Sequence, residues 1–365
     1  MKSRIHAVLL ALIVAMTQGV HGSRKPDVAW WQGGHAGPVN AVGFRFDGPL
    51  LARHTSTRWN TQMPIRKSAI LSLAAVALLG GCGGAPDQIP PEAPRSHSSW
   101  QSAWVHSNGI RLHYWRTGGA GKPPLVLAHG ITDYGLNWAS LAERFEGEYD
   151  IVMYDARGHG YSDKPDGPYD LATHVADLAG LIRALGIERP VLMGHSMGGA
   201  IVARAAASDP GLARAVILED PADMLARLEP LGEAIIPPWK KQVRDDRRAG
   251  MAKLIDMART KRHPGWRDRD YELWAESKLL ASPNVVDILH GDGFGDAGVT
   301  YPKLLVPTLI LKADADADSR KKHIEIARLL PNGRLVHIDG AGHVIRNDRP
   351  ADTEREIRAF LSGNP

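Results

Sequence analysis

The stretch Gly194-His195-Ser196-Met197-Gly198 limits what this chain can fold into more than any other. It follows an apolar run over 190–193 and precedes an alanine-rich run that reaches Ala207, a pattern typical of a buried strand, a tight turn and a helix. Glycines on both sides of Ser196 remove Cβ atoms that would collide as the backbone reverses, so the serine can occupy a strained, exposed turn. Its hydroxyl would then lie at a helix N-terminus, where the dipole favours negative charge.

The same motif suits a glycine-rich turn of a nucleotide-binding fold, so residues elsewhere must decide. A nucleophilic serine needs a base and an acid that orients the base, and in one known arrangement both follow the serine in the chain. Gly340-Ala341-Gly342-His343 follows the last expected strand, and the aspartate-rich segment 312–318 follows an earlier one. The order of the chain therefore favours a catalytic serine.

Five features in this order resemble the α/β-hydrolase superfamily over residues 99–365. They are His129-Gly130 after a strand, the segment 155–163, the Gly-His-Ser-Met-Gly turn, the aspartates near 314, and 340–343. The resemblance implies an α/β fold, with a mostly parallel central sheet flanked by helices and a helical cap at about 222–301. It also implies a serine hydrolase of the carboxylesterase or lipase type, which cleaves a carboxylic ester or related acyl substrate through a Ser-His-Asp triad and an acyl-enzyme.

The resemblance also assigns roles to individual residues. Ser196 would be the nucleophile and His343 the base. The backbone N–H groups of Ile131 and Met197 would form the oxyanion hole. No metal, nucleotide or redox cofactor is implied, and the expected partner at this site is a small-molecule acyl substrate.

The position of the triad acid is left open between two residues after the strand expected at 307–311. A Gly-x-x-Asp spacing, with Ala313 in the glycine position, favours Asp316, which we prefer. A strand that ends in Lys-Ala-Asp would instead select Asp314, and Asp318 comes next. The alternating aspartates also suggest calcium, but the glycine turn and closing glutamate of an EF-hand are missing.

Three polar residues outside this set are expected to have structural roles. His159 precedes the serine and lies in a loop that the family uses structurally, so it is not expected to be the base. Thr132 or Asp133 is expected to cap the helix that follows.

Composition excludes some classes of protein. The chain has 365 residues, of which 44% are hydrophobic and 23% charged, as in soluble globular proteins. A formal net charge of +4 is small for this length and gives no sign of nucleic-acid binding. The stretch 240–270 is basic; a solvated helix face is the preferred interpretation, and attraction to an anionic substrate or lipid headgroups is the alternative.

The N-terminal region contains two signal-like segments. Residues 1–62 begin with a basic and apolar stretch but are expected to be an upstream extension, with the true start at Met63. Residues 63–81 resemble a lipoprotein signal peptide that ends at Cys82, the single cysteine, which would carry the lipid. Residues 82–98 are a Pro/Gly/Ser-rich linker. We therefore expect an exported lipoprotein of the cell envelope, in the outer membrane or facing the periplasm, with the membrane as a partner through this anchor.

Two other functions remain open at this stage. One is hydrolysis of a carbon–carbon bond in a ring-cleavage product, which uses the same triad. The other is a non-catalytic α/β-hydrolase that binds a ligand. A serine at the turn argues against haloalkane dehalogenase or epoxide hydrolase activity, because relatives with those activities have an aspartate there.

Overall fold

A computed structural model of the chain describes residues 28–32, 99–224 and 232–364. The chain divides into two compact units, and every described residue belongs to the unit formed by 1–33 and 93–365. Residues 34–92, the other unit, lie outside the described residues. So do the first signal-like segment, the lipoprotein-type signal and Cys82.

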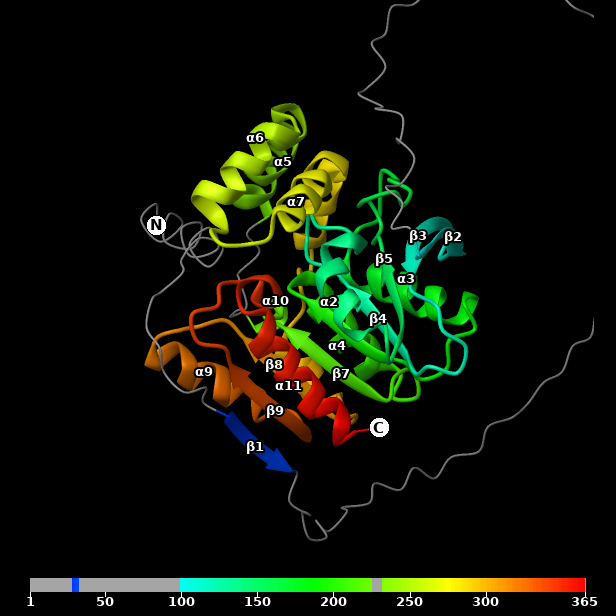
Figure 1. Cartoon of the computed structure of the whole chain (residues 1–365), viewed down its shortest axis with the longest axis vertical. Helices are drawn as coiled ribbons and strands as arrows, with labels where there is room; N and C mark the ends of the chain where they lie inside the picture. Colours follow the sequence, from blue (N-terminus) through cyan, green and yellow to red (C-terminus); the bar gives the residue numbers. More distant parts are fainter. Residues whose placement is uncertain (1–27, 33–98, 225–231, 365) are drawn as a thin grey trace, which may run out of the picture. The chain divides into compact units, whose positions relative to one another are not determined.

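The described unit is built on a nine-stranded sheet with the order β1-β9-β8-β7-β6-β4-β5-β3-β2 (Figure 1). Strands β5, β4, β6, β7, β8 and β9 run parallel to their neighbours within that set, and β1, β2 and β3 pair antiparallel. The strands are β1 (Val28–Gln32), β2 (Gln101–Ser107), β3 (Ile110–Arg116), β4 (Pro124–Ala128), β5 (Asp150–Tyr154), β6 (Val191–His195), β7 (Ala215–Glu219), β8 (Thr308–Lys312) and β9 (Asn332–His337). The predicted α/β architecture is confirmed.

Helices cover both faces of this sheet because its central strands are apolar on both sides. One set of strand side chains, such as Val126, packs with α3 (Leu171–Ala184), α4 (Met197–Ser208) and the end of α9 (Ala317–Ala327). The alternate set, such as Leu127, packs with α2 (Ala139–Phe145) and α11 (Pro350–Ser362). The strand ends between these layers are therefore fixed on both sides.

The hairpin predicted from Asn108-Gly109 is present as the β2–β3 pair. Asn108 and Gly109 have φ values of 46° and 81°, as a type I′ turn requires. This antiparallel pair forms one edge of the sheet, whereas β1 pairs with β9 at the other.

Between β7 and β8 the described residues, 222–224 and 232–303, form helices and contain no strand. The elements are η2 (Ala222–Met224), α5 (Gly232–Ala249), α6 (Met251–Met257), η3 (Ala258–Arg262), α7 (Asp268–Leu280), η4 (Pro283–Leu289), α8 (Ala297–Thr300) and η5 (Tyr301–Lys303). Part of this insertion, α6 and α7, packs around Trp266, Tyr271 and Trp274 in an apolar cluster that also includes Val344 from the segment before α11. We refer to residues 232–303 as the helical insertion; its role as a cap stays a prediction.

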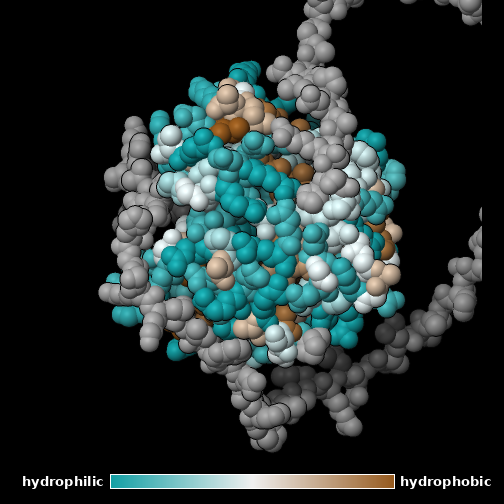
Figure 2. Space-filling model, in the orientation of Figure 1, coloured by the Kyte–Doolittle hydropathy of each residue, from teal (hydrophilic) through white to brown (hydrophobic). Residues whose placement is uncertain are grey.

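The surface of the described unit is mostly hydrophilic. On the face shown in Figure 2, brown hydrophobic side chains form small spots among teal ones. Basic side chains of the helical insertion are partly neutralised, for example by the Lys240–Asp287 and Arg259–Asp268 ion pairs. No helix among the described residues is long and apolar enough to cross a membrane.

Candidate active site

The predicted strand–turn–helix is present, with Ser196 between β6 and α4. Its backbone has φ 52° and ψ −115°, a strained conformation for a residue with a side chain. A Cβ on Gly194 would collide with the carbonyl of Gly198, so the turn needs this glycine.

Ser196 is not as open to solvent as its motif suggests: it is 6% exposed. Distant segments pack around the turn, because the N–H of Ala222 donates to the carbonyl of Ser196 at 3.1 Å. Gly199 lies against Pro221, and a Cβ on Gly199 would meet Pro221 at 2.8 Å. The segment after β7 is thus held against the serine.

The loop after β4 approaches the same turn from another side. Gly198 lies so close to the carbonyls of Ala128 and His129 that a Cβ there would collide with both. Met197 is the first residue of α4, where backbone N–H groups have no acceptor within the helix. This arrangement suits an oxyanion hole, although the roles of Met197 and Ile131 stay predictions.

The acid that contacts His343 is Asp220, in the segment just after β7. Nδ1 of His343 lies 2.6 Å from Oδ2 of Asp220, and the carboxylate can only accept, so Nδ1 carries the proton. The prediction of Asp316 or Asp314 is therefore wrong in this structure. The acid lies one strand away from the expected strand end, since β7 and β8 are neighbours in the sheet.

The two aspartates proposed from sequence have other roles. Asp316 caps α9, where its Oδ1 accepts from the N–H groups of Asp318 and Ser319. Asp314 supports the loop that carries His343: its Oδ2 accepts from the N–H of Gly340 at 2.9 Å. Asp314 is thus linked to the base through the backbone, and not through a side-chain contact.

Lys312, the last residue of β8, lies two residues before Asp314, the nearer of the two predicted acids. Its ammonium group forms an ion pair with Oδ1 of Asp220, so the two carboxylate oxygens have different partners. Burial would raise the pKa of Asp220, but the charge of Lys312 and the hydrogen bond from His343 outweigh it and hold the pKa well below its usual range. Asp220 is therefore ionised throughout the neutral range.

A second buried carboxyl, Asp223, lies three residues further along. Its Oδ1 accepts a hydrogen bond from the hydroxyl of Tyr301 at 3.2 Å, and Oδ2 has no hydrogen-bond partner among the described residues. Burial raises the pKa of Asp223 to about 7. Two neighbouring carboxyls of one segment thus have opposite pKa shifts, because Asp220 has a cation beside it.

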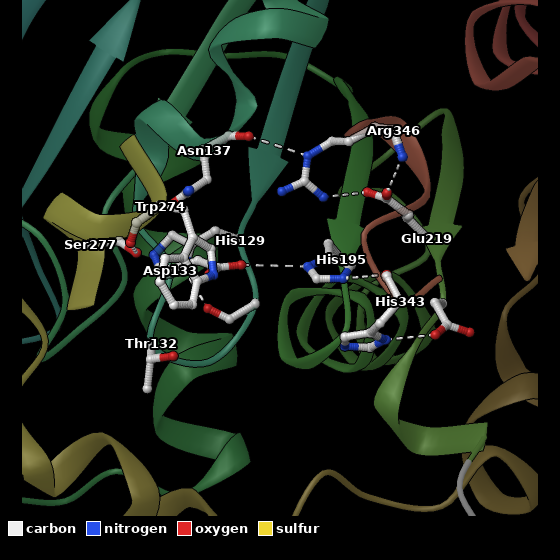
Figure 3. Close-up of polar contacts among 12 residues, drawn as sticks. His129, Thr132, Asp133, Asn137, His195, Glu219, Trp274, Ser277, His343 and Arg346 are labelled. Carbon is white, nitrogen blue, oxygen red and sulfur yellow. Dashed lines mark hydrogen bonds and ion pairs between the residues drawn. The ribbon is translucent and has the colours of Figure 1, made fainter. Parts of the chain in front are cut away.

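A polar network joins the serine turn, the base and the helical insertion. Nε2 of His195 donates to the carbonyl of His343 at 2.9 Å (Figure 3). Nδ1 of His195 lies 3.6 Å from Oδ2 of Asp133, and burial lowers the pKa of His195, so the ring is neutral. Asp133 accepts from Nζ of Lys278 on α7 at 2.9 Å, and Lys278 also donates to the carbonyl of Thr132 at 3.1 Å.

The sequence predicted that Thr132 or Asp133 caps the following helix, but the structure differs. The N-cap residue there is Tyr134, at the start of η1 (Gly135–Trp138).

His159 has the structural role that was expected. Its Nδ1 donates to the carbonyl of Arg157 at 2.8 Å, and its Nε2 accepts from the N–H of Thr132 at 3.2 Å. Burial lowers the pKa of His159 well below its usual value, which keeps the ring neutral. It thus fixes the loop that includes Ile131, the predicted oxyanion donor.

Among the described residues, no group of three or more His, Cys, Asp or Glu side chains is placed to bind a metal ion.

Sequence reasoning missed the residues whose partners come from distant parts of the chain. Asp220 was visible only as part of Glu219-Asp220-Pro221 leaving the sheet, and Lys312 only as the residue before the aspartates. One signal was available, because functional groups in parallel sheets gather at the carboxyl ends of strands and β7 ends in two acids. Glu219 is excluded as the partner of His343 because it is paired with Arg346 (Figure 3).

Comparison with known proteins agrees with this architecture. The family model described as the alpha/beta hydrolase fold matches residues 123–349, which include the serine turn, Asp220 and His343. The chain belongs to the α/β-hydrolase fold family. It is a hydrolase by this membership, whereas the family as a whole does not define the substrate.

Three relatives are named for the cleavage of different acyl compounds. The chain is 32% identical over 253 residues to N-formylmaleamate deformylase of Pseudomonas putida, covering 66% of this chain and 89% of the relative. It is 29% identical to 2-(acetamidomethylene)succinate hydrolase of Mesorhizobium japonicum, with the same two coverages of 66% and 89%. The crystal structure of the enol-lactonase of Burkholderia xenovorans LB400 is similar at 25% identity and a TM-score of 0.57, over 71% of this chain and all of that one.

Proposed function

We propose that this α/β-hydrolase is a serine hydrolase that cleaves a carboxylic ester, or a related acyl compound such as an amide or lactone, through Ser196, His343 and Asp220. The observation that carries the proposal is the 2.6 Å hydrogen bond between His343 and Asp220, whose segment is hydrogen-bonded to the strained turn of Ser196. Acyl transfer by a serine hydrolase requires a nucleophile, a base and an acid that orients the base.

In the proposed reaction, Nε2 of His343 takes the proton of the Ser196 hydroxyl while the serine oxygen attacks the acyl carbon. Asp220 holds the proton on Nδ1, so that Nε2 is free to accept. The N–H groups of Ile131 and Met197 stabilise the negative oxygen that forms. His343 then protonates the leaving group, and a water molecule, deprotonated by His343, releases the acyl group from Ser196.

Three relatives support a small acyl group as substrate, whereas others, such as epoxide hydrolase 1 of Caenorhabditis elegans at 23% identity, are named for a different substrate. Two of the three are named for an N-formyl or acetamido compound and one for an enol-lactone. The names of these relatives therefore include both amide and ester substrates. We extend the proposal to both bond types, which share a tetrahedral intermediate at the acyl carbon.

The test is a panel of p-nitrophenyl esters of graded chain length, N-formyl and N-acetyl amides and small lactones. Purified wild-type protein is compared with Ser196→Ala, which should lose turnover by about three or more orders of magnitude while remaining folded. Turnover that is equal in the two proteins would refute the mechanism. Absence of turnover and of labelling by a fluorophosphonate in the wild type would favour a non-catalytic, ligand-binding protein.

We also propose that the enzyme is exported and attached to a membrane through a lipid on Cys82. The proposal rests on the lipoprotein-like sequence 63–81 and on the linker 82–98, which would hold the folded unit away from the membrane. Cleavage before Cys82 would remove β1, whose backbone pairs with β9 in the structure. The N-terminus of the mature protein decides between these arrangements: a start at residue 82 supports the anchor, whereas a start near residue 23 that retains β1 contradicts it.

A further inference from the structure

We propose that Lys312 is a positioning residue for the catalytic base: it holds Oδ1 of Asp220 so that Oδ2 faces His343, and its charge limits how strongly Asp220 stabilises the imidazolium. This inference rests on the proposed function, because it concerns the same site. It adds a fourth side chain, a cation, to the three that perform the reaction.

The geometry that supports it is the division of one carboxylate between two partners. Nζ of Lys312 forms an ion pair with Oδ1, and Nδ1 of His343 contacts Oδ2 at 2.6 Å. Both charged side chains are buried, since Lys312 is 6% and Asp220 9% exposed. The pair is therefore little screened by water or salt.

The sheet itself fixes the pair. Strands β7 and β8 run parallel and side by side, with Glu219 opposite Leu311, and the N–H of Asp220 donates to the carbonyl of Leu311 at 2.8 Å. Asp220 and Lys312 each follow one of these paired residues, so their backbones cannot move apart without breaking the ladder. The pairing of β7 with β8 therefore places the side chain of Lys312 within reach of Asp220.

The chemical consequence follows from charge. During the reaction, His343 becomes positive and is stabilised by the negative charge of Asp220. A cation on the other oxygen of the same carboxylate reduces this stabilisation. Removing the charge of Lys312 should therefore strengthen the attraction between Asp220 and the protonated base.

Other titratable groups surround this cluster and must be controlled. His195 and His263 act on His343, whereas His323 and Asp223 lie within the electrostatic reach of Lys312. The titratable and charged groups on the neighbouring elements are Asp133 before η1, His195 in β6, Glu219 in β7, Asp223 in η2, Arg262 in η3, His263 after η3, Lys278 in α7, Asp316 before α9, His323 in α9, His337 in β9 and Arg346 in α10 (Ile345–Asp348). Asp223 is the one carboxyl among them with a pKa raised to about 7, so it could affect the same pH range.

The experiment measures the pH profile of kcat/KM for wild type, Lys312→Met and Lys312→Arg with an ester that the wild type hydrolyses. In Lys312→Met the acid limb should move to higher pH by about one unit or more, because the imidazolium is better stabilised and Asp220 is itself protonated more easily. Lys312→Arg, which keeps the charge, should restore the limb, with KM unchanged in both variants. A profile of Lys312→Met that coincides with that of the wild type overturns the proposal.

Two matched variants separate this role from a general loss of stability. Lys122→Met removes a half-buried lysine, which donates to the carbonyl of Glu146 far from the strand ends that carry the site, and should leave the profile unchanged. The same set in an Asp223→Asn background should show the same shift, whereas a shift that disappears there would assign the effect to Asp223. If Lys312→Met does not fold, a double variant that carries both Asp220→Asn and Lys312→Met is compared with Asp220→Asn alone. Equal pH profiles of the remaining kcat/KM in these two proteins support the coupling.

A second readout is independent of turnover. The downfield NMR signal of the Nδ1–H of His343, which Asp220 accepts, reports the protonation of the ring as the pH is varied. The midpoint of this titration should move to higher pH in Lys312→Met and return to the wild-type pH in Lys312→Arg. A shift in a protein that hydrolyses nothing would contradict the proposed function and support this inference, whereas turnover without any shift would do the reverse.

Discussion

The ends of β7 and β8 differ in a way that their positions in the sheet do not reveal. They are neighbouring parallel strands, and each is followed within two residues by an aspartate, Asp220 after β7 and Asp314 after β8. After β7, Asp220 is buried and contacts the base; after β8, Asp316 is exposed and caps a helix. The difference teaches that a catalytic carboxylate is defined by what it faces and not by the density of acids around it.

The largest effect expected from this comparison is that of Asp220→Asn. The amide cannot hold the proton on Nδ1 of His343 as a carboxylate does, so kcat should fall by about four orders of magnitude with KM little changed. Steady-state kinetics on the best ester of the panel gives this value. A loss below about tenfold, with a severe loss in Asp316→Asn instead, would return the acid to the end of β8.

The next effect is on stability and concerns Asp223. Since the folded-state pKa is raised to about 7, from an unfolded value near 4, the folded protein holds a proton that the unfolded chain has lost between these pH values. The free energy of unfolding should therefore fall as the pH rises from about 4 to about 7, by about 4 kcal/mol relative to Asp223→Asn. Denaturant unfolding of both proteins at pH 4 and pH 8 measures the difference. Parallel pH dependences in the two proteins would show that Asp223 is ionised when folded.

A smaller effect is expected for Asp314→Asn. The carboxylate accepts from the N–H of Gly340 and from the guanidinium of Arg320, so it fixes the loop before His343. An amide keeps one acceptor and loses the charge, and kcat should fall about tenfold. Kinetics and thermal unfolding are measured together, because a fall in kcat without a fall in melting temperature would identify positioning of the base. Loss as severe as that of Asp220→Asn would mean that Asp314 acts directly.

Asp316→Asn should have the smallest effect. Asparagine caps helices as well as aspartate does, so α9 should keep its N-terminus and kcat should stay within about twofold of wild type. This variant has the same change of charge as Asp220→Asn, which makes it the matched control for that substitution. A clear loss of kcat would show that the end of β8 does more than cap a helix.

Features determined by local backbone geometry could be predicted from the sequence. The serine turn requires glycine at 194 because a Cβ there would collide with Gly198 of the same five residues, and Asn108-Gly109 likewise specifies its hairpin locally. His343 could be proposed as the base because its glycine-rich loop follows the last strand, and its contact with Asp220 agrees with that proposal. These parts of the molecule are specified by neighbours along the chain.

Features determined by tertiary contacts could not. The choice between acids depends on which strand end faces His343, and the motif after β7 has no distinctive spacing. The partners of Asp133, namely Lys278 from α7 and His195 from β6, lie far away in sequence, so a cap was the natural but wrong interpretation. Burial of Ser196 likewise depends on segments that the motif does not include.

The most direct measurement of the central claim is the site of covalent modification by a fluorophosphonate. The wild type is incubated with the probe, digested and mapped by tandem mass spectrometry, beside Asp220→Asn and Asp316→Asn. The proposed mechanism predicts one adduct per chain, on Ser196, formed at the wild-type rate in Asp316→Asn and far more slowly in Asp220→Asn. An adduct on another serine, or equal rates of labelling in all three proteins, would contradict it.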